Sequence, residues 1–142
     1  MKIIDVILTK SYTGFYFDDQ KAIKAGATQD GFTYIGEPVT PKFSAIRQRG
    51  EAVSIMLVLE DGQVAVGDAA AVQYSGTGGR DDLFLSEEGI EVLEKHIKPL
   101  LIGEDISKFR PLAERFDKLL VDGKLIHTAL RYGLSQAFLD GA

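Results

Sequence analysis

Hydrophobic positions follow two different periods along this chain. Near the N-terminus, Ile4, Val6 and Leu8 stand at every second position, which predicts a half-buried strand. From Ser86 onward the apolar residues recur with a period of roughly 3.6, which predicts helices. Strands that precede helices are typical of the α+β class. We therefore expect an α+β fold in which a small antiparallel β-sheet is followed by a helical bundle.

A β-hairpin is the clearest local prediction. Asp61-Gly62 is a dipeptide favoured in tight type I′ turns, because both central residues need a positive φ there. The return strand begins at Val64, and the first strand or a strand near Phe43–Arg47 would complete the sheet. The strand before the turn is indicated by alternating apolar residues at Val53, Ile55, Leu57 and Leu59.

From Ser11 to Thr40 the hydrophobic residues follow no sustained period, and several glycines occur. This pattern predicts a loop that contains at most a short helix at Asp19–Ala25. Loops of this length in a compact domain are usually binding segments or lids. We therefore expect function to be carried here more than in the regular elements.

Three helices are predicted in the second half. The first should end at Lys98-Pro99, because proline disfavours a helical residue before it. The second runs from Phe109 to Leu120, with Asp122-Gly123 closing it. The third has a broad apolar face from Ile126 to Phe138, which we expect to pack against another surface.

Composition fits one ordinary globular domain spanning residues 1–142, with 45% hydrophobic and 26% charged residues. The chain has no cysteine, which excludes disulfides, cysteine-based zinc sites and thiol nucleophiles and fits a reducing cytoplasm. No signal peptide or membrane span is recognisable, so we expect a cytoplasmic protein. The net charge of −5 and the small basic cluster of Lys42, Arg47 and Arg49 argue against nucleic acid or membrane as partners.

Most of the familiar motifs are absent. The glycine cluster Gly76–Arg80 lacks the ending of a P-loop and the last glycine of a dinucleotide fingerprint. His96 and His127 are too isolated to suggest a metal site. His127 should begin a helix, and His96 should lie near a helix end. The adjacent acids at Asp18-Asp19, Asp81-Asp82 and Glu87-Glu88 point in different directions, so structural roles are favoured for them.

Two loop segments are better candidates for binding. Phe15, Tyr16 and Phe17 are consecutive aromatics that cannot all face one core. Gln73 and Tyr74 stand together just after the return strand of the hairpin. Both segments join aromatic and polar side chains in predicted loops, which is typical of ligand contacts.

Segments along the whole chain resemble 3-methylaspartate ammonia-lyases of the enolase superfamily. The resemblance is specific to this family and implies the N-terminal capping domain of a two-domain enzyme. It is carried by Thr13–Gln20 (TGFYFDDQ), Asp30–Tyr34 (DGFTY), Leu57–Val64 (LVLEDGQV), Gly67–Arg80 (GDAAAVQYSGTGGR) and His127–Leu139 (HTALRYGLSQAFL).

The resemblance implies a lyase of amino-acid catabolism, on the route of glutamate degradation, that converts L-threo-3-methylaspartate to mesaconate and ammonia. In such enzymes a (β/α)8 barrel supplies a lysine base and the ligands of Mg²⁺, which steadies the enolate-like anion. No position of this chain matches those residues. We therefore expect no catalytic residue and no metal ligand here, no activity of this chain alone, and a homodimer when the enzyme is complete.

Within the cap, Gln73 matches the family's glutamine that reaches the amino group and carboxylate of the amino-dicarboxylate substrate. Phe15, Tyr16, Phe17 and Tyr74 match segments that close over the barrel mouth. The resemblance also leads us to expect that the apolar face from Ile126 to Phe138 packs partly within the cap and partly against the barrel domain. Two alternatives remain at this stage. The chain could be a stand-alone binding module with the same fold, or an independent enzyme, although no nucleophile–base constellation supports the second.

Overall fold

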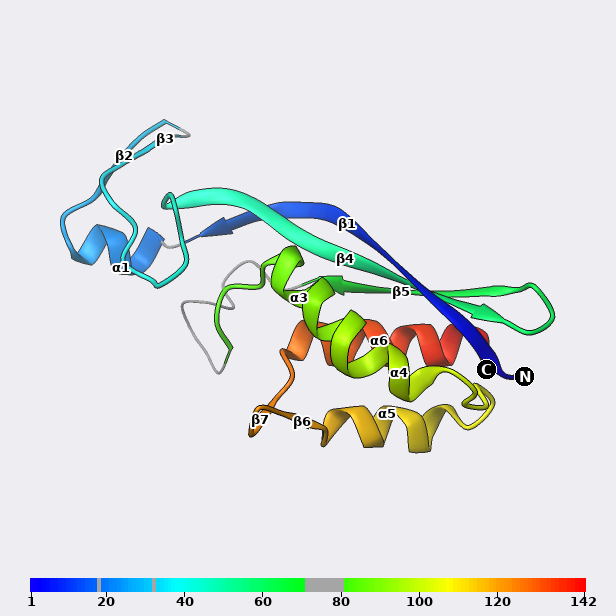
Figure 1. Cartoon of the computed structure of the whole chain (residues 1–142). Coiled ribbons are helices and arrows are strands. Elements are labelled where there is room, and N and C mark those ends of the chain that lie inside the picture. The colour runs from blue at the N-terminus through cyan, green and yellow to red at the C-terminus, as the bar shows by residue number, and fades with distance from the viewer. Residues whose placement is uncertain (18, 32, 71–80) are drawn as a thin grey trace.

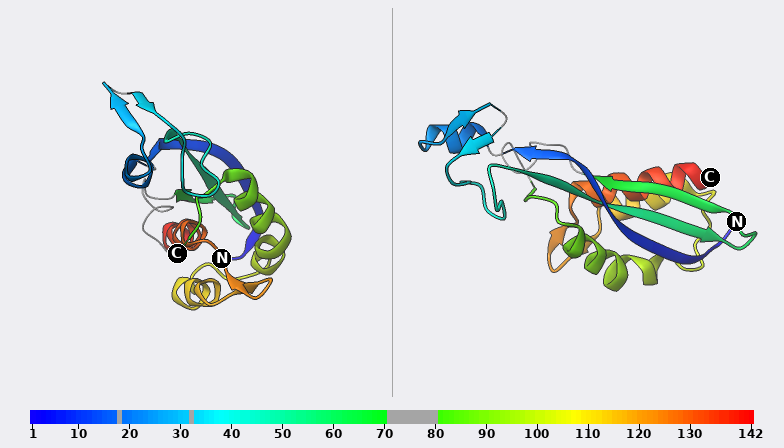
Figure 2. Two further views of the ribbon diagram at one scale, coloured as in Figure 1. Left: turned by 90° about the vertical axis from the view of Figure 1, so that its left-hand side faces the viewer. Right: turned by 90° about the horizontal axis from the view of Figure 1, so that it is seen from above.

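The core of the fold is a three-stranded antiparallel sheet with the order β1-β4-β5. The computed structural model describes residues 1–17, 19–31, 33–70 and 81–142, and only the backbone at 15–17, 19 and 20. Helices of the second half lie together on one face of the sheet, which curves over them (Figures 1 and 2). The predicted α+β fold is confirmed. The strands of this sheet are β1 (Ile3–Phe17), β4 (Arg47–Leu59) and β5 (Val64–Ala70).

Helices α3, η1 and α4 form one continuous rod, and α5 and α6 pack beside it (Figure 1). The rod does not end at Lys98-Pro99, so that prediction is wrong. The Lys98 N–H donates to the Leu93 carbonyl, which widens the helix to a π-turn just before the proline. A π-turn changes which carbonyl each N–H pairs with, and it can therefore accommodate Pro99, which has no N–H to donate. The bounds are α3 (Ser86–Val92), η1 (Leu93–Ile97), α4 (Lys98–Leu101), α5 (Phe109–Asp117) and α6 (Thr128–Gly141).

Strand β1 is longer and less regular than its sequence predicts. It continues to Phe17, where it pairs with Arg47, so the loop predicted from Ser11 begins later. Pairing shifts by one residue between Ile3 and Asp5, which marks a β-bulge. The bulge buries Ile3 and leaves Ile4 54% exposed, contrary to the predicted alternation.

Residues after β1 form a small projection beyond the end of the sheet, which we call the arm (residues 19–31 and 33–46; Figures 1 and 2). The predicted short helix is confirmed as α1 (Asp19–Lys24), and a hairpin of β2 (Thr28–Asp30) and β3 (Thr33–Ile35) was missed. The alternative strand near Phe43–Arg47 is not formed: of this range only Arg47 lies in a strand, as the first residue of β4. The predicted link between the first strand and the hairpin, which completes the sheet, is confirmed.

The two Asp-Gly dipeptides behave differently from their predictions. At the β4–β5 turn Gly62 has a φ of +88° but Asp61 does not have a positive φ, so the turn is not type I′. Asp122 and Gly123 instead have φ values of 52° and 78°, as a type I′ turn requires. They join β6 (Leu120–Val121) to β7 (Lys124–Leu125), and α5 therefore ends three residues before Leu120.

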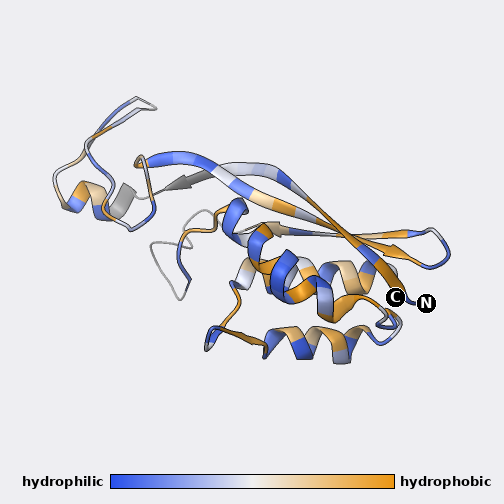
Figure 3. Ribbon diagram, in the orientation of Figure 1, coloured by the Kyte–Doolittle hydropathy of each residue, from blue (hydrophilic) through white to orange (hydrophobic). Residues whose placement is uncertain are grey.

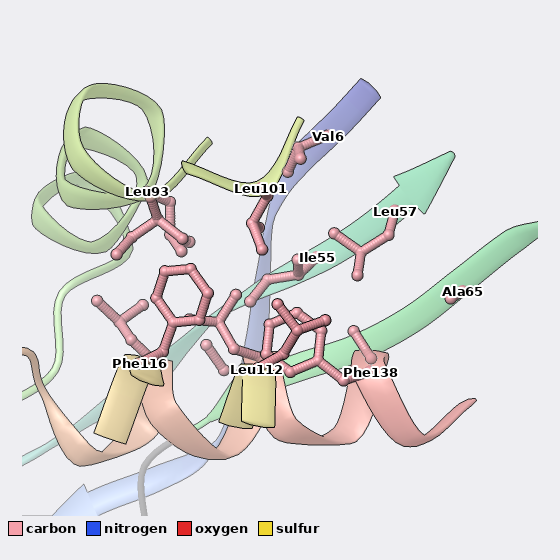
Figure 4. Close-up of a cluster of buried hydrophobic side chains, with 14 of the residues drawn as sticks. Val6, Ile55, Leu57, Ala65, Leu93, Leu101, Leu112, Phe116 and Phe138 are labelled. Atoms are coloured by element: carbon pink, nitrogen blue, oxygen red, sulfur yellow. The ribbon is translucent and has the colours of Figure 1, made fainter. Parts of the chain in front are cut away.

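The main core lies between the sheet and the helices (Figure 4). Buried apolar residues of β4 and β5 belong to this core, and Figure 3 shows apolar stretches of both strands above the helices. The apolar face predicted from Ile126 to Phe138 is buried entirely within the described chain, so the expectation that part of it faces another domain is wrong. The side chains that meet in Figure 4 include Val6, Ile55, Leu57, Leu93, Leu101, Leu112, Phe116 and Phe138.

Candidate functional site

Helix α6 lies against β5 at backbone contact distance. A Cβ on Gly133 would come within 2.7 Å of the Ala69 amide nitrogen, and a Cβ on Gly67 within 2.7 Å of the Ala137 amide nitrogen. Real Cβ atoms do not approach this closely, so glycine is required on both elements. The end of β5, which leads into the segment 71–80, is thereby fixed on the first half of α6.

Polar side chains of α6 also satisfy backbone amides of β5. Gln136 accepts a hydrogen bond from the Asp68 N–H at 2.7 Å, and Asp140 accepts one from the Val66 N–H at 2.9 Å. Unpaired amides at a sheet edge otherwise invite pairing with another chain. Helix α6 therefore positions β5 through its side chains as well as through its glycine.

The beginning of α6 contacts Asp81 and Asp82, where the chain re-enters the described structure. His127 Nε2 lies 2.8 Å from the Asp82 carbonyl oxygen, and the Thr128 hydroxyl donates to a carboxylate oxygen of Asp81. Arg131 donates to the Thr128 hydroxyl oxygen at 3.0 Å. We call these contacts the α6 clamp (His127, Thr128 and Arg131 on Asp81 and Asp82). Both ends of the segment that contains Gln73 are thus attached to the same helix.

Lys42 also holds Asp82, through an ion pair. Its ammonium lies 3.4 Å from a carboxylate oxygen of Asp82 and 3.0 Å from one of Glu88. Burial works against the charged form of Lys42, but the two carboxylates outweigh it and the pKa of its ammonium is raised. Lys42 itself has a φ of +73°, an uncommon conformation for a side chain of this size.

The residues that follow Asp82 are held by packing. Leu83 is buried beside Phe43, and Phe84 enters the main core. The Phe84 ring lies 5.1 Å from the His127 ring, and a Cβ on Gly89 would be only 2.9 Å from it. The attachment of residues 81–84 therefore has an apolar part, to which the ring of His127 also contributes.

Glu51 fixes the start of α3 from the neighbouring strand. Its carboxylate accepts hydrogen bonds from the Ser86 hydroxyl at 2.6 Å and the Ser86 N–H at 3.3 Å, and it lies 3.5 Å from the Lys10 ammonium. Burial raises the pKa of Glu51, but these partners outweigh it and the net pKa is lowered. An ionised carboxylate thus acts as the N-terminal cap that α3 lacks in its own sequence.

A pocket of about 700 Å³ opens beside the α6 clamp. It contains charges of both signs, and several of them are already paired with one another. It is lined by Lys42, Asp81, Asp82, Leu83, Phe84, Leu85, Glu88, Gly89, Val92, Lys124, Leu125, His127, Leu130 and Arg131. Within the described ranges, His, Asp and Glu side chains nowhere gather in a group of three or more suited to a metal ion. The residues described here do not fit a magnesium centre.

Only some of the residues proposed from sequence for substrate contact lie in the described part of the chain. Gln73, Tyr74 and the glycine cluster Gly76–Arg80 lie outside the described residues. Phe15, Tyr16 and Phe17 belong to β1 by their backbone, not to the loop that was predicted. The described part of the chain contains no helix with the length and apolar character needed to cross a bilayer.

The sequence identified part of the clamp and missed the rest. His127 was expected to begin a helix, and it does so as the N-cap of α6. His96 lies exposed in the last turn of η1, but α4 continues the helix, so the end expected near His96 comes only at Leu101. Asp81 and Asp82 were assigned structural roles, which their contacts bear out. Thr128 carried no signal of its own, since Asp81 lies 47 residues away in sequence, and Arg131 joins the clamp only through Thr128.

The first comparison with known proteins concerns the fold. A muconate lactonizing enzyme from Pseudomonas putida has the same fold in its matched part, with a TM-score of 0.58 at 16% identity over 99% of this chain and 28% of the other. At this identity the likeness is one of fold. The family model described as methylaspartate ammonia-lyase N-terminus matches residues 1–142. The chain therefore belongs to the methylaspartate ammonia-lyase family, in its N-terminal part.

Relatives with high sequence identity to this chain are named methylaspartate ammonia-lyase. Methylaspartate ammonia-lyase from Clostridium tetanomorphum is 62% identical over 140 residues, covering 99% of this chain and 34% of its own length. Its magnesium complex has a TM-score of 0.92 at 62% identity, and its Q73A variant has 0.92 at 61%, each over 99% of this chain and 34% of the other. The Citrobacter amalonaticus enzyme, solved with (2S,3S)-3-methylaspartic acid, has 0.92 at 62% over the same shares. The chain spans about a third of the length of these relatives.

Proposed function

We propose that this chain is the capping domain of a methylaspartate ammonia-lyase and that residues 1–142 form that domain as a single unit. The observation that carries the proposal is the match to two such enzymes at 62–63% identity across 99% of this chain, within the N-terminal family region. At this identity the backbone is nearly superimposable, with a TM-score of 0.92. The proposed partner is the (β/α)8 barrel of the same enzyme.

The proposed substrate is an amino-dicarboxylate of the 3-methylaspartate type, since the similar enzyme from Citrobacter amalonaticus contains that compound. We assign Gln73 to its amino group and carboxylate. The Q73A variant of the Clostridium tetanomorphum enzyme is 61% identical to this chain and the unaltered enzyme 62%, and one residue in 140 is about 0.7%. The lower value supports an identical glutamine at the aligned position.

An amide is suited to this role because it can accept from an ammonium and donate to a carboxylate without adding a charge. Phe15, Tyr16, Phe17 and Tyr74 are proposed to exclude water from the closed site, which strengthens the electrostatic interactions inside it. Magnesium, bound by the barrel, would supply charge stabilisation for the anion formed from the substrate. This chain orients and encloses the substrate, and proton abstraction belongs to the barrel.

The test is mesaconate formation from 3-methylaspartate with Mg²⁺ by three samples. We expect this chain alone to be inactive, a polypeptide with the remaining two thirds of a related enzyme to be inactive, and the two together to be active. Activity of this chain alone would overturn the assignment. Inactivity of the mixture, together with a raised melting temperature of this chain in 3-methylaspartate, would favour a stand-alone binding module instead.

The role of Gln73 has its own test in the assembled enzyme. We expect Gln73→Ala to lower kcat/KM by about 100-fold, the scale of losing a positioned polar contact in a closed site, while the melting temperature stays within about 2 °C. An unchanged kcat/KM would remove Gln73 from the site.

Two further expectations have separate tests. Light scattering of the assembled enzyme tests the expected homodimer, and cell fractionation tests the expected cytoplasmic location.

A further inference from the structure

We propose that His127 and Thr128 are positioning residues for the reaction: through the α6 clamp they set where the segment containing Gln73 ends. The inference rests on the proposed function of Gln73 and adds two residues to it. Neither residue is assigned a contact with substrate. Their role is to fix Asp81 and Asp82 on the same helix that holds the end of β5.

His127 makes two hydrogen bonds that together define its tautomer. Nδ1 accepts from the Ala129 N–H at 3.0 Å, so Nδ1 carries no hydrogen. Nε2 therefore carries the hydrogen and donates to the Asp82 carbonyl at 2.8 Å. One neutral ring thus caps α6 and ties the chain at Asp82 to that cap, which is more than an N-cap requires.

Thr128 forms the second tie. Its hydroxyl donates to the Asp81 carboxylate and accepts from Arg131, so the hydroxyl hydrogen is directed at Asp81 by a cation behind it. Hydrogen bonds with an ionised partner are stronger and more directional than neutral ones. The two ties hold successive residues, which fixes both the position and the direction of the chain at 81–82.

Apart from the His127 ring, which lies against Phe84, the clamp is separate from the packing that holds the fold. Leu83 and Phe84 are almost fully buried, and the apolar face of α6 is buried against β5 and α5. Thr128 is on the other hand only partly buried, and Asp82 is exposed. Removing the clamp should therefore shift residues 81–82 without unfolding the domain. A shift of about 1 Å at a substrate contact can cost about 100-fold in rate.

The experiment uses the assembled enzyme with Thr128→Val, which keeps the shape of the side chain and removes both of its hydrogen bonds. We expect kcat/KM for 3-methylaspartate to fall about tenfold, chiefly through a higher KM because Gln73 contacts the bound substrate. Thr128→Ser, which keeps the hydroxyl, should restore most of it. The matched control is Ser107→Ala, which removes a 2.8 Å hydroxyl–carboxylate bond to Asp105, the residue that bridges Lys2 near the N-terminus, and should leave kcat/KM unchanged.

A double-mutant cycle with Gln73→Ala separates positioning from general stability. If the clamp acts through Gln73, Thr128→Val should cost little further kcat/KM once Gln73 is alanine. An equal loss in both backgrounds, or no loss in the wild-type background, would overturn the inference. If Gln73→Ala itself has no effect, the proposed role of Gln73 has failed, and a remaining loss in Thr128→Val would place its effect elsewhere.

His127→Asn provides an independent variant in case Thr128→Val does not fold. Asparagine preserves the N-cap, since its side-chain oxygen can accept from the first turn of α6, but it is too short to keep the tie to Asp82. We expect a raised KM with a melting temperature close to that of the wild type. An unchanged KM with intact folding would contradict the role of His127.

Discussion

The two ends of the β1–β4 ribbon are built in different ways. At one end α6 lies on β5 with glycine against backbone, and its apolar side chains are buried. At the other end the arm has mostly exposed strands, and its apolar residues Ile23, Ile35 and Val39 are about half exposed. Because burial of apolar area is the main source of stability, the α6–β5 end should hold the fold and the arm should contribute little to it.

The arm is nevertheless attached to the sheet. Ala22 and Ile46 are buried, and the Arg47 guanidinium lies 4.9 Å from the centre of the Tyr34 ring. Such cation–π contacts at exposed sites are worth about 0.5–1 kcal/mol. A few contacts of this size place the arm without making the rest of the fold depend on it. The difference indicates which substitutions will be tolerated at each end.

The largest expected effect is at the buried end. Phe138→Ala should lower the free energy of unfolding by about 3–5 kcal/mol, because a fully buried ring is replaced by a cavity in the main core. Ile35→Ala in the arm should change it by less than about 0.5 kcal/mol, since its side chain is largely in water. Urea denaturation of both variants measures the contrast. Similar losses would show that the arm is part of the cooperative core.

A smaller but sharper test concerns the helix–strand contact. Gly133→Ala adds one methyl group where the nearest atom, the Ala69 amide nitrogen, is 2.7 Å away. We expect a loss of about 2 kcal/mol from overpacking, although alanine favours a helix interior by about 1 kcal/mol over glycine. Thermal denaturation gives the sign. A raised melting temperature would mean that α6 and β5 can separate without cost.

The smallest expected effect is electrostatic and depends on pH. Glu51→Gln keeps an acceptor for Ser86 but removes the charge that faces Lys10 and the α3 terminus, and should cost about 1 kcal/mol at neutral pH. The folded pKa of Glu51 is lowered from 4.5, so its contribution is present above that value and is lost as pH falls through the folded pKa. Urea midpoints of both proteins should therefore converge in acid. A difference that persists at low pH would contradict the assignment.

Local sequence predicted what depends on neighbouring residues. The strand–helix order, the hairpin around Asp61-Gly62, the helix at Asp19–Lys24 and the start of a helix at His127 all follow from local sequence patterns, although the turn type predicted at Asp61-Gly62 was wrong. The family resemblance, carried by whole segments, is confirmed by the family match. Of the proposed substrate contacts, Gln73 and Tyr74 lie outside the described residues, and that role stays a prediction for them and for Phe15, Tyr16 and Phe17.

Only the tertiary structure decided the features that join distant residues. The extension of β1 to Phe17 depends on the partner β4, and the register shift after Ile3 inverts which isoleucine is buried. The helix continues past Pro99 because a π-turn and a buried Leu101 stabilise it despite the proline. Thr128 meets Asp81 only because α6 returns to the end of the sheet. Periodicity reports burial along one element, whereas these contacts depend on which elements meet, and no local pattern contains that information.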